Sequence, residues 1–335
     1  MVCIFMYGRL TCTLNGSCIV LVHILYSRSY SQARTQVVQP MVQRLLLPNV
    51  TCPSLSRSMA ASQEKASVIV LHSEQLGPIE ALSVKTFEPF TKSQVLLVEI
   101  RAADRAVGLP KTAILKVFDP KYLSDRHNGR RAPEWTAKAE MNAMKQRAGG
   151  AYADWDEYFM YQDDFDAGTE QAQAMWEEHF YRLMLECYES EKHAYEALET
   201  MQGRHIPRLY AYGNLQSGPA RALDPPFVLI EYISNGVKLS DMKGTLSTDS
   251  QRMAADLCSA VDRFGSLGVV HTDINRQNIL ICPDRVVLID FGCAGVCSRF
   301  DYGDMTEEQK QERWNLTVTQ NNDSHWIRYE LGIPR

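Results

Sequence analysis

The chain has 335 residues, 45% of them hydrophobic, and a formal net charge of -5 at pH 7. This length and apolar content suffice for two domains or for one two-lobed enzyme with a real core. The acidic balance supplies no basic surface, which argues against binding to nucleic acid. The nine cysteines are odd in number and widely spread, which indicates reduced thiols and not a disulfide framework.

Residues 1–66 differ in composition from the rest and are predicted to be a targeting-like or disordered segment. No acidic residue precedes Glu64, while arginines are scattered among serines and apolar residues, as in organellar transit segments. The apolar run "SCIVLVHILY" could equally be the core of a secretory signal, and it is short for a membrane span. Alternatively, Met59 is the true start of the protein.

These readings lead to different compartments. We expect a cytoplasmic protein without firm membrane association, and a mitochondrial or secretory destination if residues 1–58 are a genuine targeting segment.

The first folded elements are predicted to be strands. The stretch "LSVKTFEPFTKSQVLLVEIR" (82–101) indicates a strand, a turn around Pro89 and a second strand. The stretch "KTAILKVFDP" (111–120) indicates a third strand, which holds Lys116 among apolar residues. Taken alone, such a lysine is usually an edge residue whose ammonium reaches solvent.

A polar tract follows, and we predict a partly irregular insertion at about 120–170. Charged, aromatic and glycine residues alternate there without a sustained period. Its acidic run "YADWDEYFMYQDDFDAGTE" could dock a basic partner, but a solvated loop is favoured.

Beyond the insertion, apolar residues at three- and four-residue steps predict a helix over 171–201, with Gly203 as a stop signal. The stretches "IPRLYAYGNL" (206–215) and "PFVLIEYI" (226–233) indicate two further strands. A second helix is predicted from about Asp249, closed by Gly268.

The stretch "HTDINRQNIL" (271–280), followed by "VVLIDFG" (286–292), sets polar side chains beside buried apolar runs. The two strands are predicted to form a hairpin that brings Asp273, Asn278 and Asp290 to neighbouring ends. Buried carboxylates need a partner, so a cation explains them best. Carboxylate and amide oxygens suit Mg²⁺ held together with substrate phosphates.

As a set, these motifs resemble the protein-kinase-like superfamily, which includes aminoglycoside and choline phosphotransferases. In organisation the chain is most similar to kinase-like proteins of fungi, including the stretch "MQGRHIP" (201–207). The resemblance covers roughly residues 83–335. It implies an α+β, two-lobed fold with an N-terminal lobe over 67–232, a long insertion before the lysine-pairing helix, and a truncated C-terminal lobe over 233–335.

The resemblance also implies roles for single residues. Lys116 matches the strand lysine that binds the α and β phosphates of ATP, and Glu191 is its best-matching ion-pair partner, with Glu189 and Glu186 as rivals. Asp273 matches the catalytic aspartate. Asn278 and Asp290 match the metal ligands of the family. The backbone of Glu231, Tyr232 and Ile233 matches the segment that faces adenine.

Several departures from the family pattern matter. No glycine-rich loop precedes Lys116, and "TFEPFTKS" occupies the turn where the phosphate-covering loop belongs. Thr272 stands where many regulated kinases carry an arginine before the aspartate. Asn275 does not distinguish protein kinases from small-molecule phosphotransferases. Only 43 residues follow Gly292, and they offer a capped helix from Thr306 and another over about 325–331.

The favoured reading is an enzyme: an ATP-dependent, Mg²⁺-using phosphotransferase acting on a hydroxyl of a protein Ser/Thr or a small metabolite. The alternative is a pseudokinase that binds nucleotide or a protein partner without useful catalysis. A binding module unrelated to ATP is the third reading. The sequence does not name the acceptor.

Overall fold

The structure is a computed structural model whose chain divides into two compact units, residues 1–64 and 65–335. It describes residues 6–14, 17–24, 68–102, 108–127, 132–153 and 168–334. In the first unit, β1 (Met6–Leu14) and β2 (Ser17–Ile24) form an antiparallel hairpin. The rest of the segment predicted to be targeting-like lies outside the described residues.

The second unit begins with a closed six-stranded barrel, in which every pair of neighbouring strands is antiparallel. Its interior is filled by fully buried apolar side chains such as Leu71, Val98 and Leu115, which explains the β-branched and aliphatic runs of the sequence. The strands predicted around Pro89, at Lys116 and over 206–233 are confirmed. In barrel order the strands are β3 (Val68–Ser73), β4 (Gly77–Phe87), β5 (Gln94–Ile100), β6 (Thr112–Val117), β8 (Pro226–Glu231) and β7 (Leu209–Leu215).

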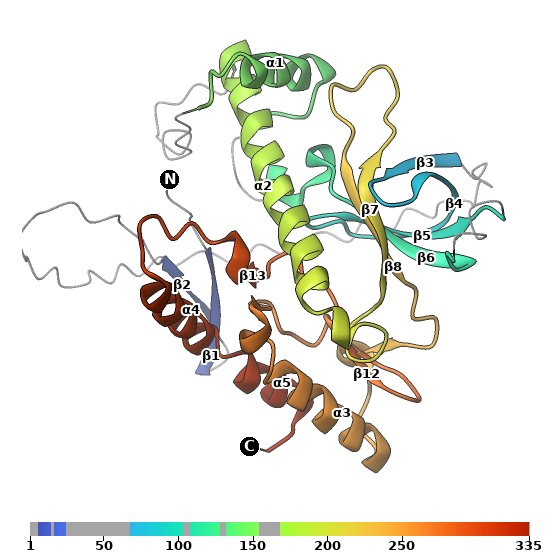
Figure 1. Cartoon of the computed structure of the whole chain (residues 1–335), viewed down its shortest axis with the longest axis vertical. Coiled ribbons are helices and arrows are strands. Elements are labelled where there is room, and N and C mark those ends of the chain that lie inside the picture. Colours follow the sequence, from blue (N-terminus) through green and yellow to red (C-terminus); the bar gives the residue numbers. More distant parts are fainter. Residues whose placement is uncertain are drawn as a thin grey trace, which may run out of the picture. The chain divides into compact units, whose positions relative to one another are not determined.

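A 28-residue helix, α2 (Glu170–Ala197), runs beside the barrel (Figure 1). It begins where the Thr169 side chain accepts a hydrogen bond from the Ala172 N–H, a standard N-cap. Its apolar face buries Phe180, Met184 and Tyr195 in the main core. The helix predicted over 171–201 is therefore confirmed.

The insertion, predicted to be partly irregular, contains regular structure within residues 132–153. They contain a helix, α1 (Ala137–Ala148), which is capped by Thr136 and packs against α2. Its sequence lacks an apolar stripe because the contacts that fix it are largely polar, notably those of buried Glu140. Most of the acidic run, residues 154–167, lies outside the described residues.

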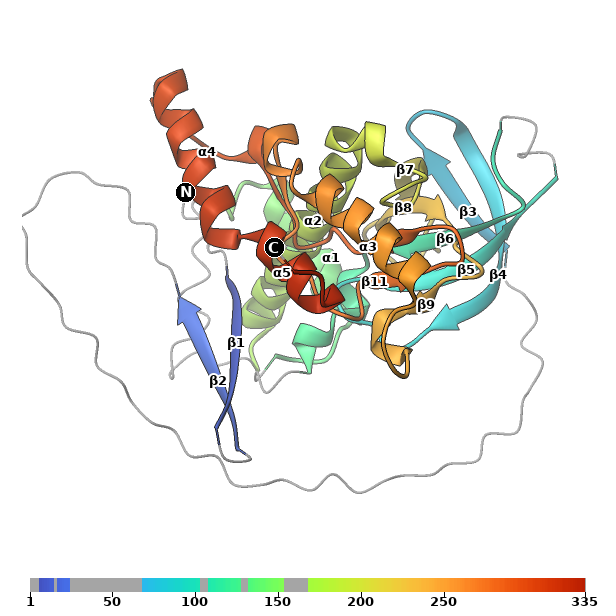
Figure 2. The ribbon, with the colours of Figure 1, turned by 90° about the horizontal axis from the view of Figure 1, so that it is seen from below.

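The C-terminal part is small and mostly helical (Figure 2). The predicted hairpin is confirmed as β11 and β12, and the capping box at Thr306 opens α4. Two short sheets support this part, one in the order β12-β11-β9 and one pairing β10 with β13. The elements are β9 (Val237–Lys238), α3 (Thr248–Val261), β10 (Val269–Val270), β11 (Ile279–Ile281), β12 (Val286–Leu288), β13 (Gly295–Val296), α4 (Glu307–Asn321) and α5 (Asp323–Leu331).

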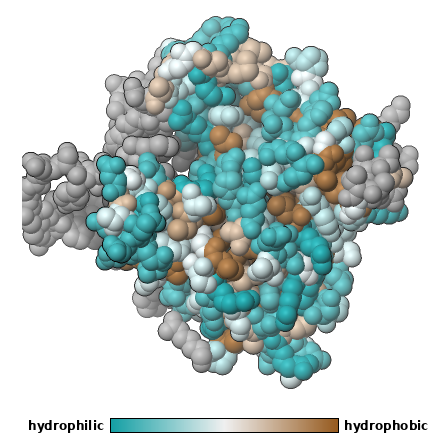
Figure 3. All heavy atoms as spheres, viewed as in Figure 1, coloured by the Kyte–Doolittle hydropathy of each residue, from teal (hydrophilic) through white to brown (hydrophobic). Residues whose placement is uncertain are grey.

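The surface is mainly hydrophilic on the face shown in Figure 3, with apolar atoms in scattered groups. Within the described ranges, none of the helices has both the length and the apolar character needed to span a membrane.

Candidate active site

The centre of the site is Lys116 on β6, flanked in register by Val95 of β5 and Val228 of β8. The residue is only 6% exposed, so its ammonium cannot reach bulk solvent as an edge lysine would. Its Nζ is paired with Glu191 of α2 and lies 2.8 Å from Asp290 Oδ1. A barrel strand, the long helix and the segment after β12 therefore meet at one cation.

The rival glutamates on α2 are engaged elsewhere. Glu186 Oε2 lies 2.8 Å from Arg299, and Glu189 Oε2 lies 3.6 Å from His193 one turn along the helix. Only Glu191 is fully buried at the level of Lys116. The helical periodicity of α2 thus points one of the three carboxylates at the lysine.

The charges of the centre shift one another's titration. Burial by itself would lower the pKa of Lys116, but Asp290 and Glu191 outweigh it and raise this pKa above its ordinary value. The Lys116 ammonium lowers the pKa of Asp290. Burial raises the pKa of Glu191 to about 7, against the opposing pull of Lys116. Lys116 and Asp290 therefore stay ionised at neutral pH, while burial favours the protonated form of Glu191.

The loop between β10 and β11 carries Asp273 and Asn278. Asp273 is exposed, whereas Asn278 is buried. The Asn278 Nδ2 donates to the backbone oxygen of Asp273 at 3.0 Å and to its Oδ2 at 3.1 Å. Asn275 donates to Asp273 Oδ1 at 3.1 Å. Two amides therefore fix the carboxylate in one orientation at the surface of the site.

His271 holds this loop from beneath. Its Nδ1 accepts from the Asp273 N–H at 3.3 Å, so its Nε2 is the protonated nitrogen that donates to Ile289 O at 3.1 Å. The fully buried ring also packs edge-on against Phe291, with centroids 4.7 Å apart. Both ring nitrogens are thus used to join Asp273 to the strand end before Asp290.

Two backbone positions in the site are left-handed. Thr272 has φ 61° and Asp290 has φ 71°, a region that residues with side chains adopt at a cost. The Thr272 hydroxyl donates to Cys293 O at 2.6 Å and so ties the two strained segments together. The strain is held by these contacts, which aim Asp273 and Asp290 at the same region.

Sequence reasoning missed Asp323, the first residue of α5. Its Oδ2 accepts from the His271 N–H at 2.6 Å, and its Oδ1 lies 3.4 Å from the Thr272 nitrogen. The residue is buried, and this burial raises the pKa of its carboxyl group. The only signal in the sequence was an acidic residue at a predicted helix start, which is usually a surface feature.

The residues expected to bind a metal fit that chemistry. Asn278 uses its amide nitrogen on Asp273, which leaves its carbonyl oxygen as a hard ligand, and the Asp290 side chain is 45% exposed. Among the described residues, no group of three His, Cys, Asp or Glu side chains could hold a metal ion. Cys293 and Cys297 are free thiols, and the Cys297 sulfur lies 3.3 Å from the Tyr302 hydroxyl.

The segment expected to face adenine begins at the end of β8. Glu231 pairs its side chain with Arg285 at 2.6 Å, and its backbone N–H donates to Arg208 O at 2.8 Å. Its side chain therefore connects the barrel to the β11–β12 hairpin. The adenine-facing role of Glu231, Tyr232 and Ile233 stays a prediction.

Comparison with known proteins gives three kinds of match. The RIO domain family matches residues 151–298, somewhat less than half of the chain. The serine/threonine-protein kinase PKH2 of Saccharomyces cerevisiae is 40% identical over 72 residues, which cover 20% of this chain and 7% of that protein. The chain therefore spans a small part of this curated relative.

Solved kinase domains of Mycobacterium tuberculosis PknI are also similar. One mutant shares 15% identity with a TM-score of 0.33, covering 64% of this chain and 59% of that one. A double mutant shares 14% identity with a TM-score of 0.35, covering 75% and 71%.

The fold is protein-kinase-like and of the α+β class, with a lobe built on the barrel, an insertion before α2 and a mostly helical second lobe. The RIO match and the kinase relative are likenesses of parts of the chain, residues 151–298 and a stretch of 72 residues.

Proposed function

We propose that the protein is an ATP-dependent phosphotransferase that transfers the γ-phosphate of Mg-ATP to a hydroxyl group. The observation that carries the proposal is the convergence of Lys116, Glu191 and Asp290 beside a loop whose Asp273 is oriented by Asn278. Phosphoryl transfer depends on positioning and charge neutralisation, and these residues supply both.

Each residue has a place in the mechanism. Lys116, kept charged by its carboxylates, would bind nucleotide phosphates, while Glu191 fixes the position of the ammonium. Asn278 and Asp290 would hold Mg²⁺, which neutralises phosphate charge when bound. Asp273 would align the attacking hydroxyl and accept its proton.

Two classes of acceptor agree with this chemistry. β13 pairs with β10 soon after Gly292, so little chain is available there to dock a peptide. This favours a small metabolite. The serine/threonine kinase name of the yeast relative favours a protein hydroxyl. The cytoplasmic location stays a prediction.

The test uses the whole chain with γ-labelled ATP, Mg²⁺ and a cell extract, separated by size. Wild type should transfer label, and Asp273→Asn should keep Mg-ATP binding but lose transfer. Asp290→Asn should lose both. Equal transfer by wild type and Asp273→Asn would refute the proposed base, and label on small molecules or on proteins would name the acceptor class.

A second candidate is a nucleotide-binding pseudokinase. It is favoured by the absence of glycine from the β4–β5 turn, 88–93, and by the direct bond between Lys116 and Asp290, which a bound nucleotide must rearrange. Saturable Mg-ATP binding by wild type without label transfer to any acceptor would establish it.

A further inference from the structure

The β4–β5 turn, residues 88–93, lies at the end of the sheet where Lys116 projects. Phe87 of β4 is opposite Val95 of β5, and Val95 is opposite Lys116. The turn "EPFTKS" therefore lies within a few residues of Val95, the residue that is paired with Lys116. It contains no glycine, but it contains a second lysine, Lys92.

This turn is docked on the segment that follows β6. The Ser124 N–H donates to Thr91 O at 3.0 Å, and Lys92 Nζ lies 2.7 Å from Asp125 Oδ2. The rings of Phe90 and Tyr122 meet edge to face with centroids 6.1 Å apart. One backbone bond, one ion pair and one aromatic contact thus fix a turn that would otherwise be solvated.

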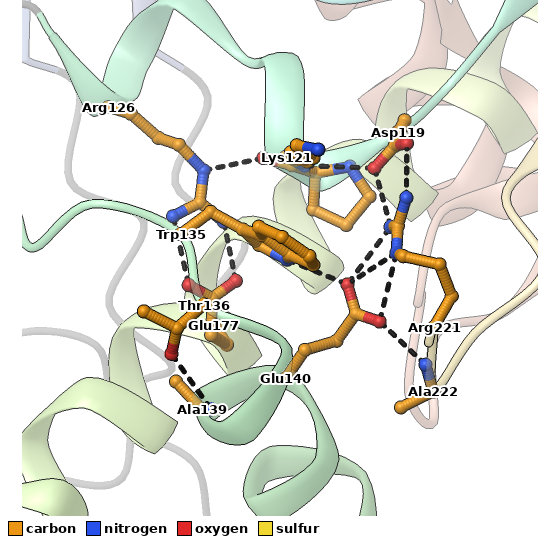
Figure 4. A network of polar contacts seen from close by, with 11 residues as sticks. Asp119, Lys121, Arg126, Trp135, Thr136, Ala139, Glu140, Glu177, Arg221 and Ala222 are labelled. Carbon is orange, nitrogen blue, oxygen red and sulfur yellow. Dashed lines mark hydrogen bonds and ion pairs between the residues drawn. The ribbon is translucent and has the colours of Figure 1, made fainter. Parts of the chain in front are cut away.

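The docking segment, residues 119–126, is itself held at both ends by ion pairs (Figure 4). At its start, Arg221 binds Asp119 through two hydrogen bonds of 2.8 and 2.9 Å. At its end, Arg126 donates to Pro120 O at 2.6 Å and to Glu177 of α2 at 3.0 Å. We call residues 119–126 the platform. Because α2 also carries Glu191, the platform and the catalytic ion pair share one rigid element.

The charge of Lys92 affects two cysteines that lie next to the site in the sequence. Burial raises the pKa of Cys187 to about 12, and Lys92 is the leading influence in the opposite direction. Lys92 also acts to lower the pKa of Cys293, which burial raises. Cys187 lies one turn before Glu191 on α2, and Cys293 lies three residues after Asp290. Along the chain, Lys92 lies three residues before Val95, the residue that is paired with Lys116 in the barrel.

We propose that Lys92 is a second cationic ligand of the nucleotide phosphates, presented by a turn that the platform holds in place. The proposal rests on the phosphotransferase function and deepens it. An ammonium has three N–H donors, so Lys92 can contact a phosphate oxygen while it stays paired with Asp125. Fixed charge thereby replaces the backbone amides that a glycine-rich loop would offer.

The experiment measures binding of Mg-ATP and of adenosine to the whole chain by titration calorimetry. Lys92→Met should raise the Kd for Mg-ATP about tenfold or more, since hydrogen bonds to charged groups are strong, and leave the Kd for adenosine unchanged. Lys92→Arg should keep most of the affinity. Lys111→Met removes an exposed lysine from the other end of β6 and should change neither constant.

A second variant separates binding from docking. Asp125→Asn removes the partner on the platform but keeps the ammonium, so Mg-ATP affinity should stay within about threefold of wild type. If Asp125→Asn matches the loss seen in Lys92→Met, or if adenosine binding falls equally, Lys92 only fastens the turn and the proposal is refuted. An unchanged Kd in Lys92→Met refutes it as well. A wild-type chain that binds no Mg-ATP would instead overturn the proposed function.

Discussion

Two cations in this molecule, Arg221 and Lys116, each lie between two carboxylates, yet their surroundings differ. Arg221 contacts Asp119 and Glu140, and Lys116 contacts Glu191 and Asp290. Around Arg221 the carboxylates have further donors: Lys121 N–H bonds to Asp119, and Trp135 and Ala222 bond to Glu140 (Figure 4). Every oxygen of the two carboxylates therefore accepts a hydrogen bond from the protein, and we call this network closed.

We call the Lys116 centre open, because its carboxylates are not all engaged within the protein. The Asp290 side chain is 45% exposed, and within the described residues Glu191 Oε1 is buried without a hydrogen-bond partner. A buried polar group that lacks a partner costs free energy and is kept where function needs it. The comparison teaches that equal numbers of charges can make a fully bonded cluster or one with accessible groups, depending on how many donors and acceptors are already satisfied.

The sharpest way to test the comparison is to remove the cation of the open site. Lys116→Met should reduce phosphotransfer about 100- to 1000-fold, the usual effect of losing one preorganised charge. It should leave the fold intact, because Glu191 already has a raised pKa and can become protonated. Label transfer and thermal unfolding are measured together, and a chain that unfolds would contradict the assignment of Lys116 to function.

The opposite change removes the cation of the closed network. Arg221→Met leaves Asp119 and Glu140 buried without their partner, and should lower the free energy of unfolding by about 3 to 5 kcal/mol. Urea denaturation measures it. The matched control is Arg252→Met, whose pair with Asp249 is exposed and should contribute less than about 1 kcal/mol. Equal effects of the two variants would break the comparison.

The open site should also make stability depend on pH through Glu191. Its pKa is about 7 in the folded chain and lower in the unfolded chain, so between about pH 4.5 and 7 the unfolded state loses the proton first. The free energy of unfolding should therefore fall as pH rises through this window, by up to about 3 kcal/mol. Denaturation curves of wild type and Glu191→Gln measure the difference, and parallel pH profiles would exclude this role.

A smaller effect is expected at Asp323, which supports the loop that carries Asp273. Asp323→Asn keeps the size of the side chain but replaces one acceptor oxygen by a donor, facing the N–H groups of His271 and Thr272. It should cost about 1 to 3 kcal/mol of stability and slow transfer with little change in Mg-ATP affinity. Single-turnover kinetics and calorimetry separate these effects. A loss confined to affinity would show that Asp323 does not position the loop.

Much of the fold could be predicted because local patterns and tertiary structure agree. The strand around Lys116, the long apolar stripe of α2 and the capping box at Thr306 all form as their periodicity or capping indicates. The helix α1 could not be predicted, because Glu140 is fixed by Arg221, 81 residues along the chain. Polar contacts between residues so far apart in the chain leave no periodic pattern in the local sequence.

The sequence by itself determined the order of the elements and the identity of the chemical groups, since hydrophobic period and turn residues act over a few positions. Only the tertiary structure decided which carboxylate faces which cation. Glu191 was selected over Glu186 and Glu189 by the register of α2 against the barrel. The turn that carries Lys92 is likewise held by the platform, through Asp125 and Ser124. Such choices depend on the packing of segments far apart in the chain, which local sequence does not encode.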